Sequence, residues 1–254
     1  MSLQLAAPRA PCSTAGLWPV SLRRLALFSS LAPLDETLIK RLKPRTLPGG
    51  AKLARSEPEE KGAWIVLSGW CARIRAMPDG RRQIVNLILP GDSIGIDAVR
   101  WAGNDLPVAA LSPVIVADAE PLRRVVELRP PEHTRLIEAC ERAALCEQVY
   151  CINSLVRMGQ QTAYERLAHL LLELNTRLEG VGLVSSRGYQ LPVTQDVIAH
   201  ALGLSLVHLS RTLRQMRKEG SIMLQPGHVQ ILKPDVLAQA ANFPHAVTWS
   251  EQRA

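Results

Sequence analysis

Residues 191–220 read LPVTQDVIAHALGLSLVHLSRTLRQMRKEG, and this stretch holds the most specific pattern in the chain. Thr194 is placed to cap a short helix, Gly203 supplies a sharp turn after it, and Ser205 is placed to cap a second helix. Two short helices joined by such a turn are typical of a helix-turn-helix motif.

The second helix of this motif is expected to bury one face and expose a basic one. Leu206, Leu209 and Leu213 recur at three- and four-residue spacings, so we expect them to face the core. The segment 205–218 contains four cations and no carboxylate. A recognition helix needs cationic and polar side chains for base edges and phosphates in the major groove. We therefore predict that the following residues bind DNA: Thr194, Gln195, Ser205, Val207, His208, Ser210, Arg211, Arg214, Arg217 and Lys218.

A hairpin is expected directly after the second helix. Residues 221–232 read SIMLQPGHVQIL, in which two β-rich runs flank Pro226 and Gly227. Proline and glycine at adjacent positions are typical of a tight turn. This hairpin would make the motif a winged helix-turn-helix.

Composition limits the class of protein. The chain has 254 residues, of which 47% are hydrophobic and 21% are charged. These fractions match soluble globular proteins and exclude wholesale disorder or a low-complexity fibre. The length suits two ordinary domains or one large domain. A formal net charge of +7 favours a polyanionic partner such as nucleic acid.

The five cysteines indicate a reducing compartment. They are odd in number and include no C-x-x-C pair, which argues against a disulfide scaffold and against a ribbon-type zinc site. No apolar run approaches the roughly 18 residues that a membrane span needs. We therefore expect a cytoplasmic protein with no membrane partner.

The chain upstream of residue 130 has a β-rich texture. Residues 22–42 first predict two short helices that flank a turn at Pro33. Between residues 45 and 128, turn residues then recur every eight to twelve positions between the strand-like runs 64–67, 71–75, 83–89 and 113–117. Such spacing is typical of a sandwich or jelly roll. The sequence MPDG at residues 77–80 predicts a hairpin turn.

A long helix is predicted over residues 132–158, which contain no proline or glycine. Its length would be about 40 Å. The apolar stripe of this helix includes small residues, where another helix could approach closely. A helix of this length usually has a second apolar face that a partner must cover. The alternative is that the helix packs wholly within its own chain. We predict dimerisation through Leu136, Cys140, Ala143 and Tyr150. Another amphipathic helix is predicted to end near Leu178.

These segments predict an α+β protein in which a double-stranded β-helix, or jelly roll, precedes a winged helix-turn-helix. The expected parts are a flexible arm at 1–18, a sensory β-roll domain at 19–130, a dimerisation helix at 131–158, a DNA-binding domain at 159–240 and a tail at 241–254.

This order of parts resembles the Crp/Fnr family of bacterial transcription regulators over residues 22–240. The resemblance rests on LSGW at 67–70, MPDGRRQI at 77–84, LPGD at 89–92, AYERLAHLL at 163–171, TQD at 194–196 and VHLSRTL at 207–213. It implies a homodimer formed through the long helix, with two recognition helices reading a two-fold symmetric operator. It also implies RNA polymerase as a further partner.

The resemblance does not extend to the family's known effectors. Cyclic-nucleotide-binding members hold the ligand with a glutamate and an arginine, whereas here Ile96 stands at the glutamate position and Asn104 or Asp105 near the arginine. A buried phosphate without its arginine would be left unpaired. Iron–sulfur members need four thiolates, which Cys12 and Cys71 cannot supply. No histidine precedes residue 133 as a haem ligand. We predict no cofactor, and the effector stays unknown.

Two other classes of function compete with DNA binding. Jelly rolls also form metal-dependent enzymes, but these need clustered histidines and the β-rich region has none. No H-E-x-x-H motif occurs among the six histidines, so we predict no enzyme. The alternative function is a ligand-sensing β-roll protein whose main role is not DNA binding. The basic second helix argues against this alternative, and a DNA-binding measurement would separate the two.

Overall fold

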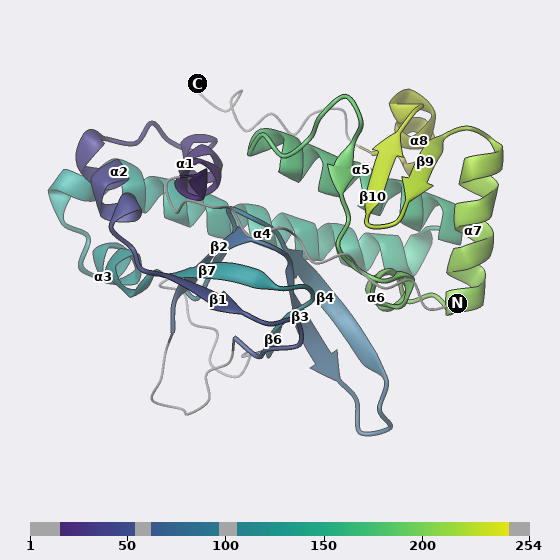
Figure 1. The fold of residues 1–254 in the computed structure, drawn as a ribbon, viewed down its shortest axis with the longest axis horizontal. Coiled ribbons are helices and arrows are strands. Elements are labelled where there is room, and N and C mark those ends of the chain that lie inside the picture. The colour runs from purple at the N-terminus through teal and green to yellow at the C-terminus, as the bar shows by residue number, and fades with distance from the viewer. Residues whose placement is uncertain (1–15, 54–61, 97–105, 244–254) are drawn as a thin grey trace. The chain divides into compact units, whose positions relative to one another are not determined.

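The computed structural model describes residues 16–53, 62–96 and 106–243 (Figure 1). These residues form two compact units. The N-terminal unit contains residues 16–74 and 87–149 with the gaps just given, and the C-terminal unit contains residues 75–86 and 150–243. The predictions for Cys12, Asn104 and Asp105, for most of the arm and for most of the tail lie outside the described residues.

Two β-sheets form the predicted roll. One sheet has the order β1-β7-β2-β5 with antiparallel pairing, and the other has the order β4-β3-β6. Val66, Cys71 and Val116 are fully buried in the core of this region. The α+β fold with a β-roll is therefore confirmed. The strands are β1 (Pro44–Leu47), β2 (Trp64–Ser68), β3 (Cys71–Ala76), β4 (Arg82–Ile88), β5 (Ser93–Ile94), β6 (Val108–Ala110) and β7 (Val114–Asp118).

The turn between β3 and β4 has the predicted hairpin form. The backbone N–H of Met77 donates to the carbonyl of Arg81 at 2.8 Å, and Gly80 N–H donates to the carbonyl of Met77 at 3.0 Å. Gly80 has φ +86°, a left-handed conformation that glycine adopts without steric cost.

The N-terminal unit begins with the two predicted helices. The two short helices around the Pro33 turn are α1 (Trp18–Ala26) and α2 (Pro33–Lys40). Proline at the first position of α2 suits a helix start, because its missing N–H would have no partner there. Asp35 then accepts from the backbone N–H of Ala32 at 2.9 Å and stabilises the first turn.

The long predicted helix is α4 (Thr134–Gln160), which follows the short 3-10 helix η2 (Pro131–His133). The first half of α4 is held by the segment after α1. Ser29 Oγ donates to Glu138 Oε2 at 2.9 Å, and Arg142 Nη1 donates to the carbonyl of Phe28 at 2.9 Å. Much of this half of the helix is therefore already covered by its own chain.

The prediction that β structure extends to Leu128 is wrong. Residues Glu120–Leu128 form helix α3, which ends where Arg129 adopts a left-handed conformation with φ 51°. Pro121 in the first turn is compatible with a helix start. The physical reason for the helix is that residues three and four positions apart lie on one helix face, where the charged side chains of this segment pair. A strand would place Glu120 and Arg123 on opposite faces.

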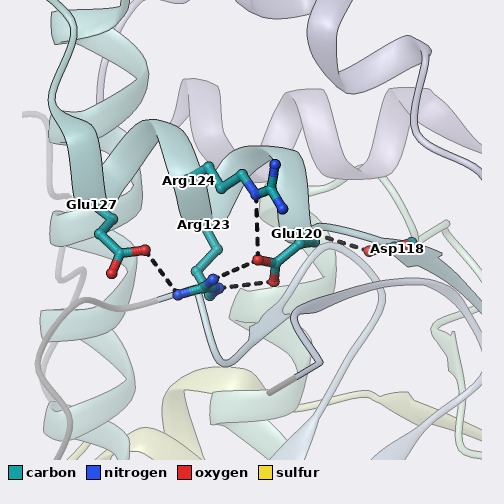
Figure 2. Close-up of polar contacts among 5 residues, drawn as sticks. All are labelled: Asp118, Glu120, Arg123, Arg124 and Glu127. Carbon is teal, nitrogen blue, oxygen red and sulfur yellow. Dashed lines mark hydrogen bonds and ion pairs between the residues drawn. The ribbon is translucent and has the colours of Figure 1, made fainter. Parts of the chain in front are cut away.

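These charged side chains form a closed network, shown in Figure 2. Arg123 Nε donates to Glu120 at 2.8 Å and its Nη1 donates to Glu127 at 2.9 Å. Arg124 lies 3.7 Å from Glu120, and Asp118 accepts from the backbone N–H of Glu120 at 3.0 Å. The network stabilises one helix and pairs both of its arginines with carboxylates of the same helix.

The C-terminal unit contains the predicted winged helix-turn-helix. Its small antiparallel sheet has the order β8-β10-β9. The turn between β9 and β10 lies at the predicted position, with Gly227 at φ +69°. The elements after α4 are α5 (Ala163–Gly180), β8 (Tyr189–Gln190), α6 (Gln195–Leu202), α7 (Leu206–Lys218), β9 (Ile222–Gln225), β10 (His228–Ile231) and α8 (Pro234–Ala241).

Helix α5 is the centre of this unit. A capping box begins it, because Thr162 accepts from the backbone N–H of Glu165 while the Glu165 carboxylate accepts from that of Thr162. The fully buried Tyr189 donates its hydroxyl to the carbonyl of Leu171 at 2.9 Å. This bond fixes β8 against α5 immediately before the helix-turn-helix begins.

A buried charge cluster joins the end of α4 to α5. Glu173 accepts from Arg157 and, at 3.3 Å, from Arg177, and all three side chains are buried. The Arg177 guanidinium also lies over the ring of Tyr150, 4.3 Å from its centre. Because an unpaired buried charge is costly, this cluster should hold the last turns of α4 in place.

None of the described helices is long and apolar enough to span a lipid bilayer.

Candidate nucleic-acid interface

The local geometry of the helix-turn-helix follows the capping residues. Thr194 Oγ1 accepts from the backbone N–H of Val197 at 3.4 Å, and Ser205 Oγ accepts from that of His208 at 3.2 Å. Gly203 ends α6 in the left-handed region with φ +62°. The predicted cap, turn and second cap are therefore confirmed.

One face of α7 packs into the unit. Leu209, Thr212, Leu213 and Met216 are buried on this face. The prediction that Leu206 faces the core is wrong, because its side chain is 47% exposed. Leu206 is the first residue of the helix, and a helical side chain leans toward the N-terminus, so it extends past the end of the packed face.

The opposite face of α7 is open and polar. Val207 is 62% exposed, and Ser210, Arg211 and Arg214 follow it at the i+3, i+4 and i+7 positions. These positions lie along one stripe of a helix. His208 is exposed beside this stripe, and the exposed Arg217 and Lys218 continue it at the C-terminal end of α7. We call Val207, Ser210, Arg211 and Arg214 the reading stripe.

The cations of α7 keep their charge unpaired. In the described part of the C-terminal unit, the ion pairs join Arg157 and Arg177 to Glu173 and Arg82 to Asp196, and His200 lies 3.4 Å from Asp196. None of them includes a cation of α7. Guanidinium groups without carboxylate partners can bind phosphate or the guanine edge without first breaking an ion pair.

The start of α6 lies against the reading stripe. The hydroxyl of Ser210 donates to Oε1 of Gln195 at 3.0 Å. Gln195 is the first residue of α6 and is exposed. The two helices of the motif are thus joined by a side-chain hydrogen bond at the face expected to meet DNA.

The far end of α7 is held by helix α5 and by Lys233, the N-cap residue of α8. Tyr164 of α5 donates its hydroxyl to Glu219 at 2.9 Å, and Lys233 Nζ donates to the carbonyl of Glu219 at 2.7 Å. Hydrogen bonds from Gln215 and Tyr164 hold the pKa of Glu219 below its usual range. The carboxylate therefore stays ionised and anchors the helix next to the wing.

All ten predicted DNA contacts lie in α6, in α7 or at their caps. Thr194 and Ser205 serve as caps, and each uses its oxygen to accept a backbone N–H. Their hydroxyl hydrogens can still donate to a phosphate oxygen. The structure thus brings the predicted residues together, and their contact with DNA stays a prediction.

The predicted dimerisation residues divide into two groups. Leu136 and Cys140 are buried within their own chain, and Ala143 and Tyr150 are half-buried. The sequence-based prediction missed other apolar residues of α4, although their recurrence at seven- and four-residue spacings was a readable signal. These missed residues are all exposed: Leu145, Ile152, Leu155 and Val156.

The cysteines fit small apolar packing residues. Cys71 and Cys140 are buried, and burial raises the pKa of both thiols to about 12. They therefore stay protonated at neutral pH, whereas a metal ligand must be a thiolate. Within the described ranges, no group of three or more histidine, cysteine or acidic side chains is placed to hold a metal ion.

The chain is similar in sequence to known transcription regulators. Residues 165–240 match the Crp-like helix-turn-helix domain. The chain is 29% identical over 231 residues to the transcriptional activatory protein AadR of Rhodopseudomonas palustris, covering 87% of this chain and 92% of that protein. It is 28% identical over 217 residues to the nitrogen fixation regulation protein FixK of Bradyrhizobium diazoefficiens, covering 84% of this chain and 89% of that protein.

A solved structure has the same fold. The structure of FixK2 from Bradyrhizobium japonicum matches with a TM-score of 0.67 at 21% identity, and it covers 81% of this chain and 98% of that one.

Proposed function

We propose, from the premise that the chain belongs to the Crp/Fnr family of transcription regulators, that it binds a specific DNA sequence as a homodimer. It is a regulator with a helix-turn-helix DNA-binding domain. In this proposal the reading stripe of α7 enters the major groove, and the protein acts in the cytoplasm without catalysing a reaction.

The observation that carries this proposal is the open face of α7. Its four cations, Arg211, Arg214, Arg217 and Lys218, are exposed and have no ion-pair partner among the described residues. Unpaired cations gain the most binding free energy from a polyanion such as DNA, because each phosphate contact releases condensed counterions. The capped helices hold this stripe rigidly and so preorganise it for a groove.

The homodimer is supported by the exposed apolar residues of α4. Leu155 is 66% exposed and Ile152 is 58% exposed, and both lie on a helix of 27 residues. A second copy of α4 would bury this surface as in other two-stranded helix pairs. Two copies would also present two copies of α7 to half-sites about 34 to 36 Å apart.

Sedimentation of the full chain tests the dimer. We expect twice the monomer mass at micromolar concentration, and Leu155→Glu should shift the protein toward monomer because it would bury a charge. Leu128→Glu on α3 is the matched control, since Leu128 is 77% exposed but lies outside α4. A monomeric wild-type protein that still binds a palindrome tightly would contradict the proposal.

The effector is proposed not to be a cyclic nucleotide. Ile96 is buried and apolar at the position where the resemblance expects a glutamate. Calorimetric titration with cyclic AMP and cyclic GMP should therefore give no binding at physiological concentrations. Micromolar affinity for either nucleotide would overturn this part of the proposal.

Mapping of bound sites in cells tests the regulatory role. We expect the protein on a limited set of upstream regions, and we expect transcripts of the adjacent genes to change when the protein is deleted. Replacing Arg211 with alanine should remove most of these sites. Unchanged transcripts together with no sequence-specific occupancy would refute a role in transcription.

A further inference from the structure

Ser210 occupies the middle of the reading stripe and makes an unusual hydrogen bond for a helical serine. It is three residues after Val207 and four before Arg214, and its side chain is half-buried. Its hydroxyl donates to Oε1 of Gln195 on the neighbouring helix, at 3.0 Å.

Thr212, two residues later, shows the ordinary alternative. Its hydroxyl donates to the carbonyl of His208 at 3.0 Å, four residues back in the same helix. Serine and threonine within helices commonly make this bond. Ser210 instead gives its hydrogen to a side chain that also faces the expected DNA surface.

This difference fixes what Ser210 can offer to a base. A serine hydroxyl has one hydrogen to donate and two lone pairs to accept. Because the hydrogen is used by Gln195, the oxygen keeps only its accepting capacity. The Gln195 amide nitrogen retains both hydrogens and can donate them to a phosphate oxygen.

We propose that Gln195 is a positioning residue that holds Ser210 as a hydrogen-bond acceptor toward the DNA, so that the base it faces must present an amino group. In the major groove, adenine N6 and cytosine N4 are the amino donors, whereas thymine O4 and guanine O6 are acceptors. A serine free to rotate can serve either kind of base. This inference rests on the proposed DNA-binding function and specifies part of its recognition code.

The test uses the full-length protein and duplexes built on the sequence that it selects from random DNA. The position read by Ser210 is identified as the one where Ser210→Ala loses base preference. At this base pair, removing the major-groove amino group, with purine in place of adenine or pyrimidin-2-one in place of cytosine, should weaken wild-type binding about five- to tenfold, the scale of one satisfied against one unsatisfied hydrogen bond.

Two variants of Gln195 separate positioning from general support of the fold. Gln195→Leu removes the acceptor at similar size, and the preference for amino bases should fall below about twofold. Gln195→Glu keeps a carboxylate oxygen as acceptor, so the base preference should survive although the added charge near phosphate weakens binding to all sequences. Gln239→Leu, at an exposed glutamine of α8 outside the helix-turn-helix, is the matched control and should leave base preference unchanged.

The outcomes distinguish this inference from the function on which it rests. Retained amino-base preference in Gln195→Leu, unchanged wild-type affinity when the amino group is removed, or no position sensitive to Ser210→Ala would each overturn the inference while leaving sequence-specific binding intact. A wild-type protein with no sequence preference on any duplex would overturn both. Melting temperatures close to that of the wild type show that the variants are folded. If Gln195→Leu fails to fold, Gln195→Glu decides the question, because loss of the base preference in that variant contradicts the inference.

Discussion

Helices α3 and α7 are both rich in arginine, yet they use their charge in opposite ways. On α3, Arg123 is held between Glu120 and Glu127, and Arg124 lies beside Glu120 (Figure 2). On α7, four cations share a helix that contains no carboxylate. The number of arginines alone does not distinguish the two helices. Their partners do: the arginines of α3 are neutralised by carboxylates of the same helix, whereas α7 presents a cationic surface.

The physical consequence is a difference in what each helix gains from DNA. An arginine already bound to two carboxylates must give up those bonds before it can bind phosphate. An unpaired arginine exchanges only water and loosely held ions, and the release of condensed counterions from DNA favours the complex. We therefore expect DNA affinity to depend on α7 and to be insensitive to α3.

The largest effect is expected at Arg211. Its guanidinium fork suits guanine O6 and N7, so Arg211→Ala should cost about 1 to 3 kcal/mol per half-site and relax the preference at one base position. Fluorescence anisotropy with a panel of substituted duplexes measures both quantities. Arg124→Ala on α3 is the control and should leave affinity and preference unchanged. The comparison of the two helices fails if the two variants behave alike.

A smaller, sequence-independent effect is expected at the end of α7. Arg217 and Lys218 are exposed at the C-terminal end of the helix, beyond the reading stripe, where phosphate contacts are expected. Replacing either residue with alanine should weaken binding to all sequences alike and reduce the slope of log affinity against log salt by about one unit. A change in base preference without a change in slope would instead place the residue at a base edge.

The smallest effect concerns the stability of α3. The hydrogen bond from Arg123 lowers the pKa of Glu120, so this carboxylate stabilises the fold when ionised and loses that contribution as pH falls through its lowered pKa. Arg123→Ala should reduce the free energy of unfolding at pH 7 by about 0.5 kcal/mol, on the scale of exposed helix pairs. The deficit should disappear in acid, below the pKa of Glu120 in the folded protein.

Urea unfolding at pH 7 and in acid measures this deficit. Arg124→Ala should have a still smaller effect, because Arg124 is more exposed and lies 3.7 Å from Glu120. A deficit for Arg123→Ala that is equal at both pH values would show that the ion pair is not its cause.

The helix-turn-helix could be predicted from the sequence because its signals are local. Thr194 and Ser205 cap helices through bonds to residues three positions away, and Gly203 adopts the left-handed turn for which glycine is suited. Such features need no knowledge of the rest of the fold. The hairpin at residues 77–80 could be predicted for the same reason.

Other features depend on burial by distant parts of the chain, and these could not be predicted. Leu206 follows the apolar spacing of α7 but lies past the packed face. The sequence predicts that Leu136 and Cys140 contact a partner helix, yet the segments around α1 and α2 already cover much of that part of α4. The hydrogen bond between Gln195 and Ser210 joins residues 15 positions apart and has no signature in sequence.

Selection from a pool of random double-stranded DNA with the purified full-length protein is the most direct test of the central claim that α7 reads DNA. We predict enrichment of a two-fold symmetric sequence whose half-site centres lie about one helical turn apart. The Arg211→Ala variant should lose preference at one position of each half-site, and the Arg124→Ala variant should enrich the wild-type sequence. No enrichment by the wild-type protein, or the same enriched sequence from the Arg211→Ala variant, would contradict the claim.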